Sequence, residues 1–438
     1  KPPYPAPFDA LRVDPAIEGN EVLNLNVWTP SDALGPHRDH GLPVMVWIHG
    51  GAFRSGTGAV EIYDGAAFAR DGIVCVTFNY RLGMDGFGLF PDAPPNRGIL
   101  DQVAALRWVR DEIAAFGGDP GRVTIAGESA GAMSALMLMA SPGAIGLFHG
   151  VIAQSGAGHH AQSAESAERV AAALGVRLGV APTARGFATV PTADFIAAQV
   201  RLAQEITTTD RASWGPLALD GMPYEPVVDG ELIPHRPIDT LRRADPSSDV
   251  PVLIGANAEE YRFWLVPLGQ IDHVSVGAVA ATGAALGLSA ERMAPYLGAP
   301  TPGVGLERLM SDWFFRIPAL RVAEVRWGGP GATYLYDFQW RSPAVDGDLG
   351  AAHAVELAFV FDTVGVPSGW GMIGEDAPRA LATEMHAAWV AFVRDGTPGW
   401  APYEAGRRTV RVFGGSRGPG AVEHDPLSTR RELWNGVR

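Results

Sequence analysis

The stretch RVTIAGESAGAMSALMLMA, residues 122–140, decides how the rest of the chain is interpreted. Residues 123–126 form a short apolar run typical of a buried strand, and a longer apolar run typical of a helix follows Ser129. Between them lies the pattern Gly-x-Ser-x-Gly. The flanking glycines allow a tight strand-to-helix turn, because a side chain at either place would clash with neighbouring backbone. The stretch therefore predicts a serine hydroxyl exposed above one end of a sheet.

A second match to this pattern tests the importance of context. Residues 414–418 also read Gly-x-Ser-x-Gly, in a chain that has 54 glycines. Ser416 follows an expected strand, but the residues after it include a proline and show no helical pattern. The sequence thus favours Ser129 over Ser416 as a nucleophile.

Short apolar runs that end in turn residues alternate with helical patterns along nearly the whole chain. This order predicts an α/β fold with a large, mostly parallel, twisted sheet flanked by helices. Strands are expected at residues 22–29, 44–49, 73–80, 123–126, 151–154, 252–256, 333–340 and 409–413.

Two helices are clear from their apolar spacing and their terminal glycines, at residues 100–118 and 379–396. Longer helical excursions lie between Gln154 and Val252 and between Trp264 and Gly328. We expect both to pack over one edge of the sheet and to form pocket walls. No repeat or linker divides the chain, so one catalytic domain is predicted over 1–438.

Composition excludes several classes of function. There are 34 Lys and Arg against 48 Asp and Glu, and the net charge of −14 disfavours nucleic acid and mildly favours neutral over anionic substrates. No apolar run is long enough to span a membrane. The single cysteine, Cys75, excludes an intrachain disulfide and lies in an apolar run, as expected of a small buried side chain.

A nucleophilic serine needs a general base, and the base needs a carboxylate. Where a Gly-x-Ser-x-Gly turn carries the nucleophile, the acid and then the histidine follow it in the chain, which leaves His273, His353, His386 and His424. His386 lies in mid-helix, His424 lies beyond the last expected strand, and His273 follows the acidic candidates too closely. His353 lies in a loop after an expected strand and is favoured as the base, with a core histidine that caps the next helix as the alternative.

The acid is expected in VPVLIGANAEEY, residues 250–261, where a buried strand ends at two adjacent carboxylates. Adjacent side chains that leave a strand point apart, so one of the two can face the site. Spacing alone leaves Glu259 and Glu260 both open, and an exposed acidic pair is the alternative.

Donors for an oxyanion are expected in VMVWIHGGAFRSG, residues 44–56. An apolar strand runs directly into Gly50-Gly51-Ala52, where small side chains let a substrate oxygen approach backbone N–H groups. The N–H of Ala130 adds another donor, each worth about 3 kcal/mol. A tight turn alone would also require glycine.

With these elements in order, the chain resembles the type-B carboxylesterase, or cholinesterase-like, family of α/β-hydrolases. The similarity runs from NEVLNLNVWTP to the C-terminal RELW. It is carried by the blocks VWIHGGAF, NYRLG, NRGILDQVAALRWVRDEIAAFGGDPGRVTIAGESAGAMS, GLFHGVIAQSG, EPVVDGELIP, IGANAEEYRFW and GAAHAVELAFVF. The resemblance implies an α/β-hydrolase fold with a gorge above the sheet.

The resemblance also implies roles for individual residues. Ser129 would be the nucleophile and His353 the base, with Glu260 preferred to Glu259 as the acid. The remaining implied positions are the oxyanion amides of Gly51, Ala52 and Ala130, the supporting carboxylates Glu128 and Glu356, and the gorge aromatics Phe263 and Trp264.

Two departures from the family pattern affect what is expected. Val22 stands where many relatives have a cysteine, which fits a disulfide-free bacterial-type member. Relatives usually begin upstream of Lys1 with small strands that rim the gorge, and these are expected to be absent here. The first residues show no apolar signal-like core, so a cytoplasmic location is expected, with secretion left open.

The expected function is that of a serine carboxylesterase. It would hydrolyse carboxylic esters of small or aryl alcohols through an acyl-enzyme, without a metal or cofactor, as a monomer or weak homo-oligomer. Two alternatives remain: a non-catalytic binding protein on the same scaffold, and amide or carbamate hydrolysis. Because members that only bind typically lose the nucleophile, Ser129 favours an enzyme.

Overall fold

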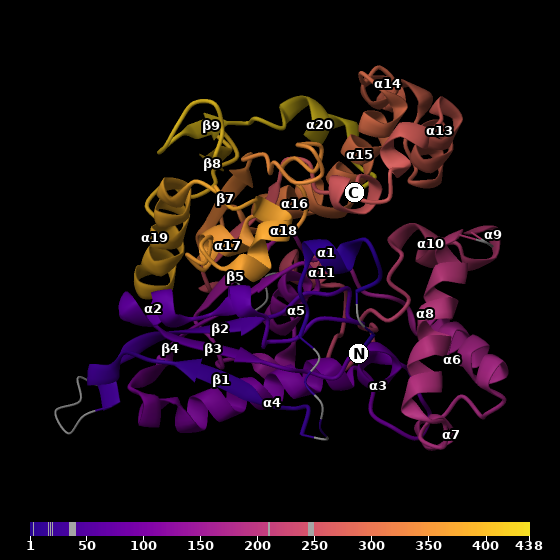
Figure 1. The fold of residues 1–438 in the computed structure, drawn as a ribbon, viewed down its shortest axis with the longest axis horizontal. Coiled ribbons are helices and arrows are strands. Elements are labelled where there is room, and N and C mark those ends of the chain that lie inside the picture. The colour runs from indigo at the N-terminus through magenta and orange to yellow at the C-terminus, as the bar shows by residue number, and fades with distance from the viewer. Residues whose placement is uncertain are drawn as a thin grey trace.

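The computed structural model describes the chain apart from residues 3, 16, 18, 20, 35–40, 209, 210 and 244–248. Within the described residues, nine strands form one sheet in the order β1-β3-β2-β4-β5-β6-β7-β8-β9 (Figure 1). Their bounds are β1 Leu25–Trp28, β2 Leu42–Ile48, β3 Val74–Phe78, β4 Gly118–Glu128, β5 Gly150–Gln154, β6 Val252–Asn257, β7 Thr333–Phe338, β8 Thr409–Phe413 and β9 Val422–His424. Strands β1 and β9 pair antiparallel at the two edges, and the pairings from β3 to β8 are parallel.

All eight expected strands are present, and one strand was missed. His424, predicted to lie beyond the last strand, belongs to β9, which pairs with β8 through Thr409 opposite His424. Only three residues long and preceded by a loop rich in Gly and Pro, β9 is too short to show a strand pattern in the sequence.

The sheet is covered on both faces, which explains why its central strands are apolar without alternation. Along β2, Val44 and Val46 belong to one apolar cluster, and Met45 and Trp47 belong to the other. Helices α4 and α5 contribute to the first cluster, and α17 and α19 contribute to the second. In Figure 1, α19 and α4 lie on opposite sides of the sheet.

The two helices predicted from spacing end as expected. Helix α4 spans Arg97–Glu112 and continues as a tighter turn to Phe116, and α19 spans Arg379–Asp395. Each ends at a glycine in the left-handed region, Gly117 at φ 84° and Gly396 at φ 70°. Helix α5, Ala130–Met139, follows Ser129 and is buried along its whole length.

The other helices are α1 Phe8–Leu11, α2 Ala66–Arg70, α3 Gly83–Phe87, α6 Ala164–Leu178, α7 Ala184–Phe187, α8 Thr192–Thr208, α9 Arg211–Trp214, α10 Pro216–Asp220, α11 Pro237–Leu241, α12 Arg262–Leu265, α13 Val276–Ala285, α14 Ala290–Leu297, α15 Pro302–Ser311, α16 Ile317–Arg326, α17 Leu357–Val360, α18 Trp370–Ile373 and α20 Ser428–Leu433. A π-helical turn, Asp312–Arg316, joins α15 to α16. Among the described helices, none has the length and apolar character that crossing a membrane requires.

The two helical excursions contain α6 to α11 and α12 to α16, and helices α6, α8, α13 and α14 of these excursions lie to the right of the sheet in Figure 1. Helices α6, α8 and α10 share an apolar cluster with Val170, Leu202 and Leu217. Thr192 and Gln199 of α8 line a cleft of about 340 Å³. The first excursion therefore forms a pocket wall, as predicted.

Candidate active site

Ser129 lies on the predicted sharp turn between β4 and α5. Its backbone adopts φ 58° and ψ −123°, a conformation that non-glycine residues rarely adopt and that costs roughly 1–3 kcal/mol. The Ser129 N–H donates to the Gln154 carbonyl at 2.9 Å, which ties the turn to the end of β5. The side chain is half-buried, so a ligand above the sheet can reach it.

The two glycines that flank Ser129 are required by backbone contacts. A Cβ on Gly131 would lie 1.9 Å from the carbonyl oxygen of Ile48, and one on Gly127 would lie 2.5 Å from the backbone of Gly131. Both positions exclude a side chain for the reason that the sequence predicted. Ser416, the other match, lies in the loop between β8 and β9 with no helix after it.

The loop after β2 lies directly against the serine turn. A Cβ on Gly50 would lie 3.1 Å from the Ser129 Cβ and 2.8 Å from the Glu128 carbonyl oxygen. Gly51 and Ala52 have positive φ, 117° and 52°. Within the described part of the chain, the amides of Gly51, Ala52 and Ala130 donate no hydrogen bond, so all three can bind a substrate oxygen.

His353 and Glu260 form a buried pair beside this turn. The His353 Nδ1 lies 2.7 Å from a Glu260 carboxylate oxygen, and the His353 backbone N–H donates to the Glu260 carbonyl at 3.2 Å. The other carboxylate oxygen of Glu260 accepts from the Asn257 N–H at 2.7 Å. The imidazole is therefore held by Glu260 through Nδ1.

The structure separates the two adjacent carboxylates that spacing left open. Glu259 points away from His353 and pairs with Arg262 at 3.1 Å and with Arg341. It also accepts from the Ala351 N–H at 3.0 Å. Glu259 thus stabilises the loop that leads to His353, whereas Glu260 contacts the imidazole.

Glu128 contacts the other nitrogen of the same imidazole. Its carboxylate lies 2.9 Å from the His353 Nε2, and within the described residues no hydrogen bond joins His353 to the Ser129 hydroxyl. Burial alone would lower the pKa of His353, but the charges of Glu128 and Glu260 outweigh burial and raise it. The arrangement strongly stabilises an imidazolium.

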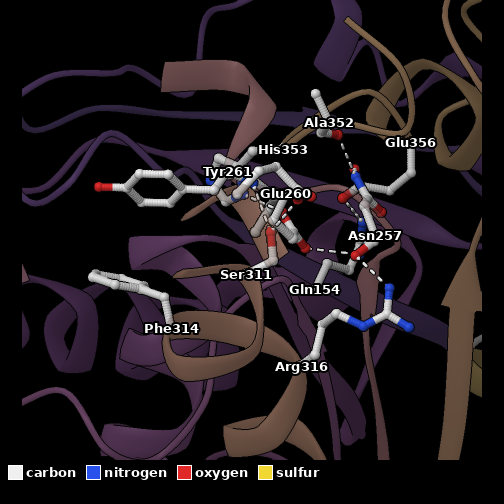
Figure 2. A network of polar contacts seen from close by, with 12 residues as sticks. Gln154, Asn257, Glu260, Tyr261, Ser311, Phe314, Arg316, Ala352, His353 and Glu356 are labelled. Atoms are coloured by element: carbon white, nitrogen blue, oxygen red, sulfur yellow. Dashed lines mark hydrogen bonds and ion pairs between the residues drawn. The ribbon is translucent and has the colours of Figure 1, made fainter. Parts of the chain in front are cut away.

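Glu356 lies behind the pair in a second buried polar network (Figure 2). Its carboxylate accepts from the Gln154 side chain at 3.1 Å and from the Asn257 side chain at 2.6 Å. Asn257 also donates to the Ala352 carbonyl at 2.7 Å, next to His353. Burial, with Glu128 and Glu260 nearby, raises the pKa of Glu356 to about 7.

Sequence reasoning missed Gln154 and Asn257 as parts of this support. Each is a polar residue at the carboxyl end of an otherwise apolar buried strand, β5 or β6. Figure 2 shows Asn257 between Glu356 and Arg316, whose guanidinium donates to the Asn257 carbonyl at 3.2 Å. The polar residue at the carboxyl end of each apolar strand was the sequence feature that could have identified them.

Aromatic rings surround the imidazole. Centroids of Trp264 and Phe263 lie 4.9 Å and 6.1 Å from that of His353, so the two predicted aromatics are near the site. Phe315 is equally close at 4.8 Å and was not predicted. It lies in the π-helical turn between α15 and α16, and sequence periodicity does not reveal such turns, which frequently occur at functional sites.

The remaining candidate histidines lie in other surroundings. His386 lies in α19, with Nδ1 2.7 Å from the Val360 carbonyl oxygen and Nε2 3.1 Å from the Asp71 carboxylate. His273 lies in an exposed turn. Among the described residues, no group of three or more His, Cys, Asp or Glu is placed to hold a metal ion.

The mostly parallel sheet with its serine turn, free amides and His–Glu pair defines an α/β-hydrolase. The sequence model of the carboxylesterase family matches residues 8–278 and 299–410. The chain belongs to the carboxylesterase family and is a carboxylic ester hydrolase.

Individual relatives agree with this assignment. The chain is 32% identical over 448 residues to the para-nitrobenzyl esterase of Bacillus subtilis, a match that spans 98% of this chain and 86% of the relative. A solved para-nitrobenzyl esterase structure matches with a TM-score of 0.83 at 30% identity, over 99% of this chain and 87% of that one. A Geobacillus stearothermophilus carboxylesterase structure matches with a TM-score of 0.80 at 33% identity, over 94% and 85% of the two chains.

Proposed function

We propose that this carboxylesterase hydrolyses carboxylic esters of small or aryl alcohols, with Ser129 as nucleophile, His353 as general base and Glu260 as the acid that orients it. The observation that carries the proposal is the buried contact of 2.7 Å between His353 and Glu260, at the sheet end where the strained turn presents Ser129. The relative named para-nitrobenzyl esterase supports esters of alcohols that carry an aromatic ring as substrates.

In the first half of the reaction, the Ser129 hydroxyl oxygen attacks the ester carbonyl carbon while the His353 Nε2 takes the hydroxyl proton. The carbonyl oxygen becomes an oxyanion that accepts hydrogen bonds from the amides of Gly51, Ala52 and Ala130. The bond from carbon to the alcohol oxygen then breaks. The imidazolium gives its proton to the departing alcohol, and the acyl group stays on Ser129.

In the second half, water attacks the acyl carbon and the His353 Nε2 takes a proton from it. The second oxyanion uses the same amides, and its collapse releases the acid and returns the proton to the Ser129 oxygen. Glu260 stays ionised throughout and stabilises each imidazolium.

Proton transfer from Ser129 requires that the His353 Nε2 exchange one partner for another. Nε2 lies 2.9 Å from the carboxylate of Glu128, and Ser129 is the next residue in the chain. We infer that the Ser129 hydroxyl replaces Glu128 at Nε2 when substrate binds, and that Glu128 then stabilises the imidazolium from the side. Glu356 holds the loop of His353 through Asn257.

The setting of the reaction follows from the same observations. We propose one catalytic domain over 1–438, because the described strands form one sheet. We also propose that the protein is a disulfide-free, bacterial-type enzyme. It would act on a small-molecule ester as a monomer or weak homo-oligomer. The single buried cysteine, Cys75, supports a cytoplasmic location.

Ser129→Ala tests the mechanism, and Ser416→Ala is a matched control from the same sequence pattern. We expect kcat for p-nitrophenyl butyrate to fall at least about a thousandfold in Ser129→Ala and to stay unchanged in Ser416→Ala. A fluorophosphonate probe should label the wild type and the control but not Ser129→Ala. Hydrolysis by Ser129→Ala at the wild-type rate would rule out the mechanism.

A further inference from the structure

The loop that carries the oxyanion donors continues into an arginine. Arg54 lies two residues beyond Ala52, and the N–H groups of Arg54 and Ser55 both donate to the Gly51 carbonyl, at 3.1 Å and 3.0 Å. This tight turn fixes the Arg54 backbone relative to the donor amides. The side chain is half-buried.

The Arg54 guanidinium has no hydrogen bond or ion pair within the described part of the chain, whereas its neighbours do. Four other charged residues line the same cleft of about 340 Å³: Lys1, Glu21, Arg81 and Asp85. Lys1 pairs with Asp14, and Arg81 forms a two-bond pair with Asp101 at 2.7 Å and 2.8 Å. Among the residues that the structure describes, no carboxylate forms an ion pair with Arg54.

Desolvation makes this unpaired charge unfavourable. Burial lowers the pKa of Arg54, and the hydroxyls of Tyr224 and Tyr4 oppose that effect. Partly buried arginines are normally paired with a carboxylate or a phosphate, because guanidinium geometry matches two acceptor oxygens. An anionic group that enters the cleft would supply the missing acceptor.

We propose that Arg54 binds a carboxylate carried by the ester substrate, so that the enzyme selects esters that bear a free carboxylate. The inference rests on the proposed function, because it places the scissile carbonyl at the amides of Gly51, Ala52 and Ala130. Two chain steps separate the Cα atoms of Ala52 and Arg54 by at most about 7 Å. The substrate carboxylate would extend from the scissile carbonyl into the cleft that Arg54 lines.

The net charge of −14 opposes this selection only at long range. At physiological ionic strength such repulsion is screened beyond about 8 Å, while a contact pair inside a cleft is screened much less. Selection therefore arises from binding in the cleft and not from steering of the approaching substrate.

Arg54→Gln removes the charge and keeps a polar side chain of similar shape, and Arg54→Lys keeps the charge without the two-pronged geometry. Arg110→Gln, on the exposed face of α4 where Arg110 pairs with Asp111, is the matched control. Each variant is assayed for kcat/KM on two pairs of esters. One pair is 4-carboxyphenyl butyrate and its neutral methyl ester, and the other is monoethyl adipate and diethyl adipate.

We expect Arg54→Gln to lower kcat/KM about tenfold or more for at least one carboxylate ester, and to change its neutral partner less than about twofold. Arg54→Lys should retain part of the preference, and Arg110→Gln should match the wild type. The pair that responds identifies whether the carboxylate lies on the alcohol or on the acyl side. An unchanged ratio of anionic to neutral rates, or an equal loss on both, would overturn the role of Arg54. Failure of the wild type to hydrolyse the neutral esters would instead overturn the proposed function.

Discussion

Replacement of Glu128 by glutamine gives the sharpest test of the electrostatics around the imidazole. The Glu128 carboxylate lies 2.9 Å from the His353 Nε2, on the opposite side of the ring from Glu260. Apart from this contact with His353, no hydrogen bond to the Glu128 carboxylate is found in the described part of the chain. Its charge therefore acts on His353 without competition from a donor.

The size of the effect follows from that distance. Two unit charges about 3 Å apart interact by roughly 6 kcal/mol at an effective dielectric constant of 20, before the cost of removing both charges from water is counted. A nearby opposite charge typically shifts a pKa by about one to three units, at about 1.4 kcal/mol per unit. We expect Glu128→Gln to lower the pKa of His353 by on the order of two units.

The direction of the shift in the pH profile follows from the role of His353 as the base. Neutral His353 accepts the serine proton, so kcat/KM falls on the acid side as His353 becomes protonated. A lower pKa therefore moves the acid limb of the profile to lower pH. The plateau should also fall, since Glu128 no longer stabilises the imidazolium of the transition state.

The assay is kcat/KM for p-nitrophenyl butyrate between pH 5 and pH 10, for wild type, Glu128→Gln and Glu112→Gln. Glu112 is the exposed last residue of α4 and serves as the control. Its profile should superimpose on that of the wild type. An acid limb for Glu128→Gln that stays in place or moves to higher pH would refute the electrostatic reasoning.

Two predictions concern stability. Gly131→Ala places a Cβ 1.9 Å from a backbone oxygen of β2 and should lower the free energy of unfolding in urea by about 3 kcal/mol or more. Gly406→Ala, which has open space around it, should leave that free energy unchanged. Equal urea midpoints for the two variants would contradict the packing argument. Burial raises the pKa of Glu356 from 4.5 to about 7, so the folded state binds more protons than the unfolded chain in that window. The contribution of Glu356 to the free energy of unfolding is complete below pH 4.5 and is lost as the pH rises to about 7, a difference of about 3 kcal/mol. Glu356→Gln should abolish this pH dependence of stability. A pH dependence that survives the substitution would exclude Glu356 as its source.

The parts of the fold that the sequence predicted are those set by local rules. Each expected strand is an apolar run closed by turn residues, and α4 and α19 end at glycines in the left-handed region. The serine turn is local too, because strand, glycines and helix lie within residues 122–140. Strand β9 escaped notice because its three residues are specified by pairing with β8 rather than by their own pattern.

Most of the candidate site was predicted through the resemblance, since the residues that meet there are far apart in the chain. Spacing could not choose between Glu259 and Glu260, because both carboxylates leave the same strand end. Their contacts differ only through tertiary partners: Glu260 contacts His353, and Glu259 pairs with arginines, Arg262 among them. The catalytic roles themselves stay predictions.

The residues that were missed share a physical reason. Gln154 and Asn257 are the polar last residues of two neighbouring buried strands, β5 and β6. Such a residue is stable there only if another element supplies its partner, and here Glu356 accepts a hydrogen bond from each. A polar side chain at the end of an otherwise apolar strand therefore points to a buried partner elsewhere in the chain, and in this protein that partner lies one turn beyond His353.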